Sequence, residues 1–588
     1  MSGSCEIAKE AQTEEARMKA YQDHSNWKIL LGVLVLLVVA CGANNEAQVL
    51  PADTIFIGEH IIPMDGSQVE AVAIRGERIV ATGTTAAVRA YQGAQTKMVD
   101  LGEKALLPGF IDAHGHLAIQ ARILDFANLS SPPVGQITSI IDLQARLRAF
   151  ISEQEIPSGQ WVIGYGYDES LLAEQRHPNR NDLDAVSDQH PILLIHVSAH
   201  LAAVNSLALA HHKIGADTPD PSGGHIRRFK GSQEPNGVLE ETAAQSVIFG
   251  QLLANSDGFA EQTRRTLELY ASYGITTVQD GAAAMRDVDV YRQIAAHTPL
   301  PIDLVAYPFV GLLSEEQRAN FLATAYQNGF RLGGVKFVLD GSIQGKTGFL
   351  REPYTQPPPG KGADFQTSPT MSPAQYQDWL KPLIARKVPV LVHANGDAAI
   401  DMMMDGFEIA LSEAPNPDHR AVIIHAQMMH KDQLDRAKAL GLVPSFFSAH
   451  PYFWGDWHRQ ILGEDRAKNI SPIRWAIDRN IPFTIHNDAP IVPPDMMFLV
   501  WVTVNRQTRS GYVLGPQQRT TAYEALYAIT MGSAYQYFEE TEKGSITVGK
   551  QADLVILANN PLTAAPDTLK DIQIIETISR GKTVFLAE

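Results

Sequence analysis

The 588-residue chain is poor in cysteine, in basic residues and in long apolar runs. Its two cysteines, Cys5 and Cys41, precede the part of the sequence that has the composition of a folded domain, so neither a disulfide framework nor a Cys-rich zinc site is expected. With 48 Lys and Arg against 65 Asp and Glu, the net charge of −17 opposes binding to a polyanion, and nucleic acid is not expected as a partner. Any metal or nucleophile chemistry must therefore come from His, Asp, Glu, Lys and Ser.

The longest apolar run, ILLGVLVLLVVA at residues 29–40, is also short. A bilayer span needs about 20 apolar residues, so this run suits the core of a signal peptide. Val38-Val39-Ala40-Cys41 resembles a bacterial lipobox, in which the cysteine becomes the lipidated first residue. We therefore expect a lipoprotein signal peptide over residues 1–40, lipidation of Cys41 and a tether over residues 41–52. A cleavable signal with an incidental cysteine, or a short anchor, is the alternative.

This reading predicts an exported bacterial lipoprotein that contacts a membrane through its N-terminal lipid only. In a Gram-negative host it would lie on the periplasmic or outer-membrane side. The sequence carries no signal for an oligomeric state.

Both ends of the remaining chain have the pattern of short β-strands. Residues 54–66 and 69–83 alternate apolar and polar side chains, with glycines at the turns. The same pattern returns in residues 544–562 and 574–587. We expect one small β-sandwich built from residues 53–107 and 543–588, although two unrelated strand pairs would give the same pattern.

Between these ends, helical segments alternate with short apolar runs rich in β-branched residues. The helical pattern of residues 260–274, for example, leads into the run 275–281. Such repetition is typical of βα units with parallel strands. It predicts an α/β fold with a (β/α)8 TIM-type barrel over residues 108–542, and a doubly wound sheet is the rival. A plain barrel takes about 250 residues, so insertions are expected, the largest between His116 and Asp280. The Pro- and Gly-rich residues 351–373 are predicted to form a lid-like loop.

The apolar runs end in residues that can do chemistry. They are His114 and His116, Asp280, Lys336, His393, His425, His450 and Asp488. The carboxyl ends of barrel strands converge on the active site, so these side chains are expected to lie together. On an extended strand, positions i and i+2 face the same way, so His114 and His116 can bind one cation.

Six segments, in order, resemble the YtcJ-like branch of the amidohydrolase superfamily, also called amidohydrolase family 3. They are LLPGFIDAHGHL, VKFVLDGSIQGKTG, LVHANGDAAI, IIHAQ, HNDAPIVPP and GSITVGKQADLVIL. The resemblance runs from about residue 53 to the end of the chain, and it implies a (β/α)8 barrel beside a β-sandwich. Two features depart from the branch. His486 stands where a small residue is common, and HPYFWGDWH, at residues 450–458, marks a sub-branch.

The resemblance implies a divalent metal centre with two Zn²⁺ per chain. The implied ligands are His114, His116, Lys336, His393, His425 and Asp488. A Lys ammonium cannot bind a cation, so Lys336 can be a metal ligand only if it is carboxylated. The alternative is an unmodified lysine that pairs with Asp340 or Asp280. Matching positions suggest substrate contacts at His200 and Asp168, with a structural role as the alternative. Further candidates are Asp340, His450 at the end of a run, and Trp454 and Asp456 in an aromatic and polar cluster, with packing or capping of the pocket as the alternative.

The implied activity is metal-dependent amidohydrolysis of a small-molecule amide. A metal-activated water attacks a non-peptide, N-acyl or N-formyl type C–N bond, and Asp488 passes the proton to the leaving nitrogen. A mononuclear deaminase on the same barrel is the nearest alternative. Such deaminases lack the strand-four Lys and place a Glu soon after the strand-five His, where this chain has Asp397. A non-catalytic ligand-binding surface lipoprotein is the alternative from another class.

Overall fold

The computed structural model describes residues 50–254, 258–358 and 360–588. The predicted signal peptide, Cys41 and nearly all of the tether lie outside these residues, so those predictions stay predictions. Ala52–Glu588 forms one compact unit. No helix in the described part of the chain combines the length and the apolar character that crossing a membrane requires.

Eight parallel strand positions form the barrel, and the fourth is split into two short strands. They are β6 (Phe110–Ile111), β13 (Ile275–Ala283), β14 (Asp303–Pro308), β15 (Phe330–Leu332) with β16 (Val335–Val338), β17 (Val390–Ala394), β18 (Val422–His425), β19 (Val443–Phe446) and β20 (Thr484–Ile485). They pair in parallel in the orders β15-β14-β13-β6 and β16-β17-β18-β19-β20. The predicted (β/α)8 barrel is confirmed, and the doubly wound sheet is wrong.

A glycine pair, Gly333 and Gly334, lies between the two halves of the fourth strand. A Cβ on Gly334 would lie 2.0 Å from the carbonyl oxygen of Pro389, so no other residue fits there. A parallel bridge from Phe309 to Lys336 joins the two sheets across this break. On the other side, the His116 amide donates to the carbonyl of Ala489 at 2.7 Å and connects the segments that follow β6 and β20.

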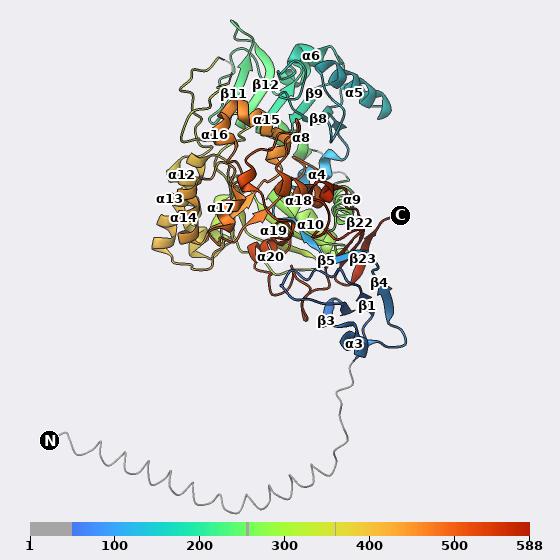
Figure 1. Ribbon diagram of the computed structural model, residues 1–588. Helices are drawn as coiled ribbons and strands as arrows, with labels where there is room; N and C mark the ends of the chain where they lie inside the picture. The colour runs from blue at the N-terminus through green and yellow to red at the C-terminus, as the bar shows by residue number, and fades with distance from the viewer. Residues whose placement is uncertain (1–49, 255–257, 359) are drawn as a thin grey trace, which may run out of the picture. The chain divides into compact units, whose positions relative to one another are not determined.

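Helices cover the outside of the barrel, and α12, α13 and α14 lie side by side (Figure 1). Ser372 caps α12 by accepting the Gln375 amide, and Pro373 occupies the first turn, where its missing N–H costs nothing. The longer helices are α9 (Phe259–Ser272), α10 (Met285–His297), α12 (Pro373–Ala385), α13 (Asp397–Glu413), α14 (Lys431–Leu440), α15 (His450–Leu462) and α18 (Met496–Asn505). Shorter ones include α4 (Leu117–Ile123), α17 (Ile473–Ile477), α19 (Ala522–Ala528) and α20 (Met531–Gln536).

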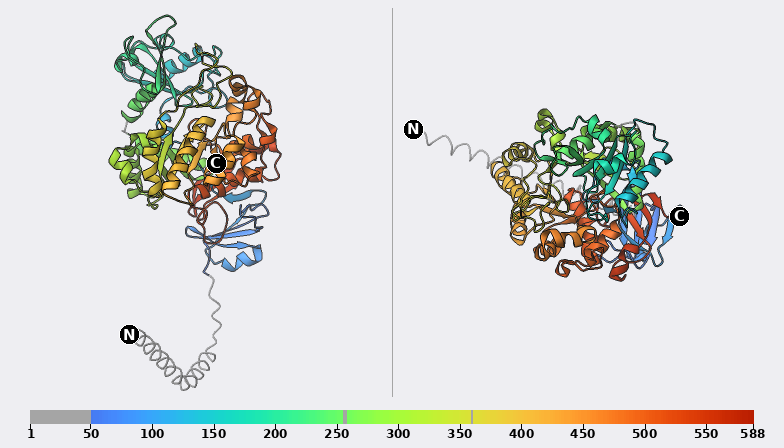
Figure 2. Two further views of the ribbon diagram at one scale, coloured as in Figure 1. Left: turned by 90° about the vertical axis from the view of Figure 1, so that its left-hand side faces the viewer. Right: turned by 90° about the horizontal axis from the view of Figure 1, so that it is seen from above.

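The two ends of the unit form one β-sandwich, as predicted. One sheet has the order β3-β2-β1-β4 and the other β23-β22-β21-β5. Their bounds are β1 (Thr54–Ile57), β2 (Ala71–Arg75), β3 (Arg78–Gly83), β4 (Lys97–Asp100), β5 (Ala105–Pro108), β21 (Leu554–Leu557), β22 (Ile574–Ser579) and β23 (Lys582–Leu586). Phe56 and Val72 share a core with Leu554 and Ile578, so the blue and red strands of Figure 2 pack together.

The predicted insertion between β6 and β13 forms a sheet of its own, which the sequence pattern did not reveal. The order is β11-β12-β10-β9-β8-β7. The bounds are β7 (Ala127–Asn128), β8 (Val162–Tyr167), β9 (Ile192–His196), β10 (Leu201–Val204), β11 (Gly224–Arg228) and β12 (Pro235–Glu241). On β9, Leu194 packs with α5 (Ile140–Glu153), whereas Leu193 packs with α8 (Thr242–Ala254). Helices on both faces explain why β9 reads as an unbroken apolar run.

Candidate metal centre

The six predicted metal ligands meet at the carboxyl ends of the barrel strands. Five strand positions supply them. His114 and His116 follow β6, Lys336 lies in β16, His393 in β17, His425 ends β18, and Asp488 follows β20. All are buried except His116, which is partly exposed. Parallel strands closed into a barrel bring these distant positions together, as the sequence predicted.

Asp488 lies at the middle of this cluster. Its Oδ1 is 3.4 Å from Nε2 of His114 and 3.2 Å from Nε2 of His116. The Lys336 Nζ is 3.0 Å from Nε2 of His114. His114, His425 and Asp488 offer ligand atoms that all lie within 4.8 Å of one another. One divalent cation can therefore be reached by several side chains at once.

Gln279, which sequence reasoning missed, fixes the orientation of His114. Its amide NH₂ donates to the carbonyl of Ala113 at 3.0 Å and to the Tyr537 hydroxyl at 2.7 Å. The Oε1 must then accept from Nδ1 of His114, at 2.6 Å. Nε2 is left unprotonated and faces the cluster, as a metal-ligating imidazole requires.

His486 does the same for His425. Nε2 of His486 is 3.1 Å from Nδ1 of His425, and Nδ1 of His486 is 2.8 Å from the Ser445 hydroxyl. When His486 donates from Nδ1 to the Ser445 hydroxyl, its Nε2 accepts from Nδ1 of His425, and Nε2 of His425 is then available for a metal. The residue that departs from the family pattern therefore positions a ligand. Its spacing of two from Asp488 was the available signal, since both lie beyond the same strand.

The structure corrects the prediction that Asp340 touches substrate. Its carboxylate is fully buried and accepts the backbone N–H groups of Phe349, Asn395 and Gly396 at 2.8–3.0 Å. Its Oδ1 lies 3.2 Å from Nδ1 of His393. Asp340 sits behind this ligand and orients it.

Two ligands adopt backbone conformations that are unfavourable for residues with a side chain. The φ angles are 76° for His425 and 56° for Asp488. Such left-handed conformations cost about 1–2 kcal/mol each, and they cluster at functional sites, where the surrounding structure imposes them. Both strands thus turn abruptly where the chemistry begins.

Burial keeps the imidazoles neutral. It lowers the pKa of His114, His393 and His425 well below the ordinary value, with further lowering from neighbouring cationic groups. Burial also lowers the pKa of Lys336 to about 7. For Asp488, burial acts to raise the pKa, but the hydrogen bond and charge of His116 outweigh it, so the net shift is downward. The cluster therefore combines neutral nitrogen donors with an ionised carboxylate.

His200 and His450 lie on the wall of a small cavity that also exposes His393, His425 and Asp488. Glu241 holds His200 through a contact of 2.8 Å between Nδ1 and Oε2. Both predicted substrate residues therefore reach the site, and contact with substrate stays a prediction.

Asp168, Trp454 and Asp456 are not among the residues that line this cavity, and their contact with substrate stays a prediction. Asp168 accepts a hydrogen bond from the Trp454 indole at 2.7 Å, so the two satisfy each other. Asp456 accepts hydrogen bonds from the hydroxyls of Thr508 and Ser510 instead.

The cluster fits a divalent metal ion. Nδ1 of His116 is a buried atom without a hydrogen-bond partner, and Oδ1 of Asp488 and Nδ1 of His393 have only ion-pair contacts of 3.2–3.4 Å. Imidazole and carboxylate groups are ordinary ligands of such ions. A (β/α)8 barrel with this donor set at its carboxyl-terminal face defines a metal-dependent hydrolase.

Similarity to known proteins identifies the family within the metal-dependent hydrolases. A model described as "Amidohydrolase family" matches residues 97–585. N-substituted formamide deformylase of Arthrobacter pascens is 28% identical, over 90% of this chain and 97% of that protein. The YtcJ protein of Bacillus subtilis (strain 168) is 26% identical, over 89% and 97%. The chain belongs to this amidohydrolase family and is a hydrolase of non-peptide carbon–nitrogen bonds.

Two solved structures have a fold similar to that of this chain. An uncharacterized metal-dependent hydrolase from Pyrococcus furiosus has a TM-score of 0.67 at 25% identity, covering 87% of this chain and 100% of that chain. A second, from Pyrococcus horikoshii OT3, has a TM-score of 0.69 at 22% identity, over 87% and 99%, and shows the same fold.

Proposed function

We propose that the protein hydrolyses a formamide, or another N-acyl amide, of a small molecule, with two zinc ions bridged by a carboxylated Lys336. One observation carries the metal arrangement. Lys336 is 1% exposed, and no carboxylate of the described residues lies within 4 Å of its Nζ. Asp340 and Asp280, the expected alternative partners, bond elsewhere: Asp280 accepts from the Tyr291 hydroxyl. A buried lysine among metal ligands, with no anion to pair with, suits a carbamate. The similarity to a formamide deformylase supports the substrate class.

Asp488 and His200 have different proposed roles in the hydrolysis. When bound, the metal lowers the pKa of a water molecule and polarises the substrate carbonyl. Asp488, ionised at neutral pH, accepts the proton of the attacking water and returns it to the leaving nitrogen. His200, held by Glu241, donates a hydrogen bond toward the carbonyl oxygen from the cavity wall. With a formamide the products are formate and an amine.

Substitution of Asp488 tests the proton transfer. Asp488→Asn should lower kcat by about 10²–10⁴, because the amide cannot accept the proton. Turnover of N-formyl amines by metal-loaded protein measures this. Asp289→Asn, in an exposed ion pair on α10, is the control and should keep wild-type turnover. A kcat for Asp488→Asn within a few-fold of wild type would refute the role.

Metal content separates the binuclear enzyme from its alternatives. About two zinc ions per chain by elemental analysis supports the proposal, one favours a mononuclear deaminase and none favours a binding protein. The position of Asp397 argues against the mononuclear deaminase. Its carboxylate accepts the Arg351 amide and lies 3.0 Å from Nε2 of His430, so it is engaged away from the cavity.

Isotope labelling tests the modified lysine. Protein prepared with ¹³C-bicarbonate should give a carbamate carbon resonance that Lys336→Met lacks. A resonance that survives this substitution, or none in metal-loaded wild type, contradicts the bridge.

We also propose that the protein is exported and anchored through lipid on Cys41. The apolar run 29–40 and the sequence Val38-Val39-Ala40-Cys41 support this. In a bacterial host, radiolabelled palmitate should enter the wild-type chain and not Cys41→Ser. Equal labelling of both chains would rule out this attachment site.

A further inference from the structure

A cavity of about 980 Å³ adjoins the metal centre on the side of the inserted sheet. Residues of β11 and β12, which Figure 1 labels, line one wall, and residues of the segment that follows Lys336 line the other. The volume is at the upper end of what a small-molecule site needs. The metal ligands do not line this cavity, so its role in the protein is separate from holding the metal.

The two sites share a wall. Gly341 and Gly345 line the large cavity, whereas Ser342 and Gln344, between them, line the small cavity at the metal centre. Glu241 lines the large cavity and holds His200, which lines the small one. The two cavities therefore lie on either side of the segment 341–345 and of the pair formed by Glu241 and His200.

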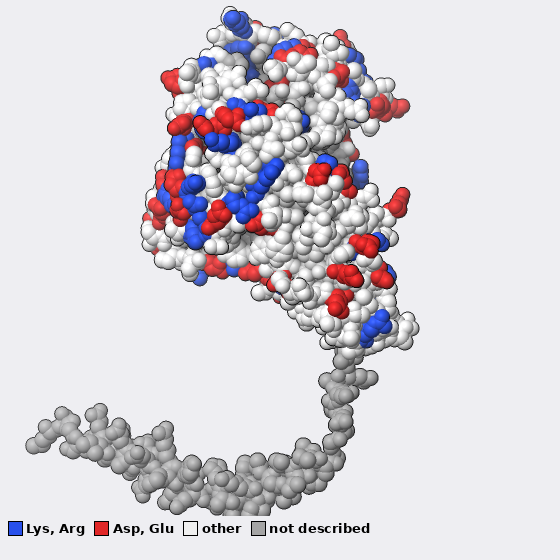
Figure 3. Space-filling view, viewed as in Figure 1, with Lys and Arg blue, Asp and Glu red and all other residues white. Residues whose placement is uncertain are grey.

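The large cavity is basic, although the chain as a whole carries a net charge of −17. Its lining contains five Lys and Arg against two Glu. The two acids are engaged, Glu240 with Arg227 and Glu241 with His200. The other four cations have no carboxylate within 4 Å among the described residues. They are Arg228, Lys230, Lys346 and Lys361. On the outer face in Figure 3, by contrast, acidic and basic side chains are interspersed.

No direct ion pair neutralises Arg228 or Lys346, although Asp220 and Glu169 act on them electrostatically from beyond 4 Å. Arg228 donates to the backbone carbonyls of Ala216, Thr218 and Gln233. Lys346 is partly buried, with its Nζ 3.3 Å from a backbone carbonyl and 5.0 Å from the centroid of the Trp457 ring. Carbonyls and an aromatic face hold a cation in place but supply no counter-charge. An anionic ligand would supply it.

We propose that this cavity binds an anionic group, a carboxylate or a phosphate, at the end of the substrate remote from the scissile amide. The inference rests on the proposed amide hydrolysis, and it names the class of substrate. Such a substrate is an N-formyl or N-acyl amine whose amine portion ends in an anion.

A matched series of substrates tests the proposal. N-formyl-6-aminohexanoate and N-formyl-6-aminohexyl phosphate carry the anion, and N-formyl-6-aminohexanol is their neutral counterpart. Wild-type enzyme should show kcat/KM about 10- to 100-fold higher for at least one of the anions than for the alcohol, as one charge-assisted hydrogen bond would give. The preferred anion identifies the group, and equal values for all three would overturn the proposal.

Substitution of a cavity lysine locates the effect. Lys346→Gln should lower the anion-to-alcohol ratio about tenfold and leave the alcohol unchanged. Lys381→Gln removes the same charge from an exposed pair with Glu413, outside the cavity, and should keep the ratio. Should Lys346→Gln fail to fold, Lys361→Gln, at an exposed position, replaces it. A ratio unaffected by the cavity substitution would place the anion elsewhere.

Calorimetry separates this proposal from the proposed function. If wild-type enzyme hydrolyses none of the three compounds, formamide hydrolysis fails. Tighter binding of an anionic compound than of the alcohol, lost in Lys346→Gln, would still support the cavity. Equal binding would overturn it.

Discussion

At the scale of single residues, the ring of His114 has almost no room to move. Gln279 holds one of its nitrogens, and Lys336 and Asp488 surround the other. Gly281 closes the remaining side, because a Cβ there would lie 2.3 Å from Cε1 of the ring and 2.6 Å from Nδ1. Neither the ring nor the strand can give way without disturbing the metal centre.

Gly281→Ala should therefore weaken metal binding. We expect a 10- to 100-fold loss of affinity, about the effect of losing a partner that orients a ligand. Titration of zinc into metal-free protein against a competing chelator measures it. Gly215→Ala is the control, since a Cβ at Gly215 has nothing within 4 Å. Equal affinities in the two variants would show that the ring tolerates displacement.

His458 makes stability depend on pH. It is fully buried, its Nε2 accepts the Gln427 amide at 2.9 Å, and burial lowers its pKa to about 3. In the unfolded chain the ordinary value is about 6.5. As pH falls below 6.5 the unfolded chain gains a proton that the folded protein does not, so stability is lost.

The size of that loss follows from the shift. Between pH 7 and pH 5, His458 should cost about 2 kcal/mol of unfolding free energy. His458→Gln keeps an acceptor for Gln427 but cannot titrate, so its stability should fall by about 2 kcal/mol less over this range. Urea unfolding of both proteins at the two pH values measures the difference. Parallel losses in the two proteins would show that His458 titrates in the folded state.

The candidate site residues could be singled out in the sequence because each lies near the end of an apolar run, and the resemblance to the amidohydrolase family implied which of them bind metal. The groups that orient the ligands could not be singled out in this way. Gln279 and His114 are 165 positions apart, and Glu241 and His200 are 41 apart. Nothing local marks such pairs, since only the closed barrel and the inserted sheet bring them together. Asp340 was misassigned for the same reason, because its partners are set by the fold.

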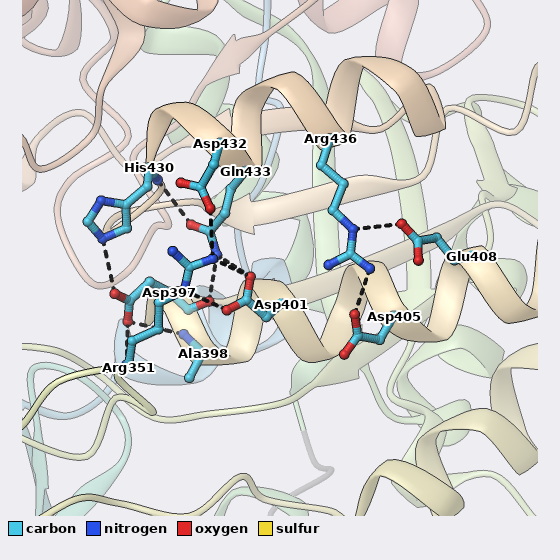
Figure 4. Close-up of polar contacts among 10 residues, drawn as sticks. All are labelled: Arg351, Asp397, Ala398, Asp401, Asp405, Glu408, His430, Asp432, Gln433 and Arg436. Atoms are coloured by element: carbon cyan, nitrogen blue, oxygen red, sulfur yellow. Dashed lines mark hydrogen bonds and ion pairs between the residues drawn. The ribbon is translucent and has the colours of Figure 1, made fainter.

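At the scale of elements, the segment beside the basic cavity is fastened to two helices by one residue. The Arg351 guanidinium donates to both carboxylate oxygens of Asp401 on α13, at 2.6 and 2.7 Å, and to Asp432 on α14 at 3.0 Å (Figure 4). On the same helices, Arg436 pairs with Asp405 and Glu408 without reaching that segment. The two arginines thus form a natural comparison.

Arg351→Ala should raise KM with little change in kcat. The pair is partly exposed, so we expect the segment to lose about 1 kcal/mol of stabilisation. If substrate binding has to restore the order of the segment, KM rises about fivefold. Arg436→Ala should cost similar stability and leave KM unchanged. Steady-state kinetics and thermal unfolding of both variants provide the test. Matching KM values in the two variants would show that Arg351 is only a surface contact.

Elements could be predicted where hydrophobic period and turn residues agree, as in the sandwich strands and the barrel units. The inserted sheet was missed for a physical reason. Its central strands are buried on both faces, so they lack alternation, and β10, β11 and β12 follow one another without intervening helices, apart from the short α7 (Ser206–His211). A short apolar run of this kind does not reveal which sheet it joins.

At the scale of the whole molecule, the C-terminal segment is fastened to the end of the barrel opposite the metal centre. Asp303 is the first residue of β14 and is 2% exposed. It receives the Lys543 ammonium and the Arg580 guanidinium, both from the C-terminal part of the chain. Glu539 shares Lys543 at 3.0 Å. A buried network of this kind joins residues 240 and 277 positions apart.

Asp303→Ala should destabilise the protein without altering its chemistry. It removes the carboxylate that Lys543 and Arg580 share in a buried setting and leaves Lys543 paired with Glu539 alone, so a loss of about 3 kcal/mol is expected. Arg78→Ala breaks the exposed pair with Glu542 and should cost about 1 kcal/mol or less. Because the carboxyl-terminal barrel face holds the active site and Asp303 lies at the opposite end, kcat per metal-loaded folded molecule should match wild type in both variants.

Chemical unfolding measures the loss of stability in the two variants, and active-site titration combined with turnover measures kcat. Equal stability losses would show that the buried network contributes no more to the free energy of unfolding than the exposed pair does. A fall in kcat with Asp303→Ala alone would show that the two ends of the barrel are coupled.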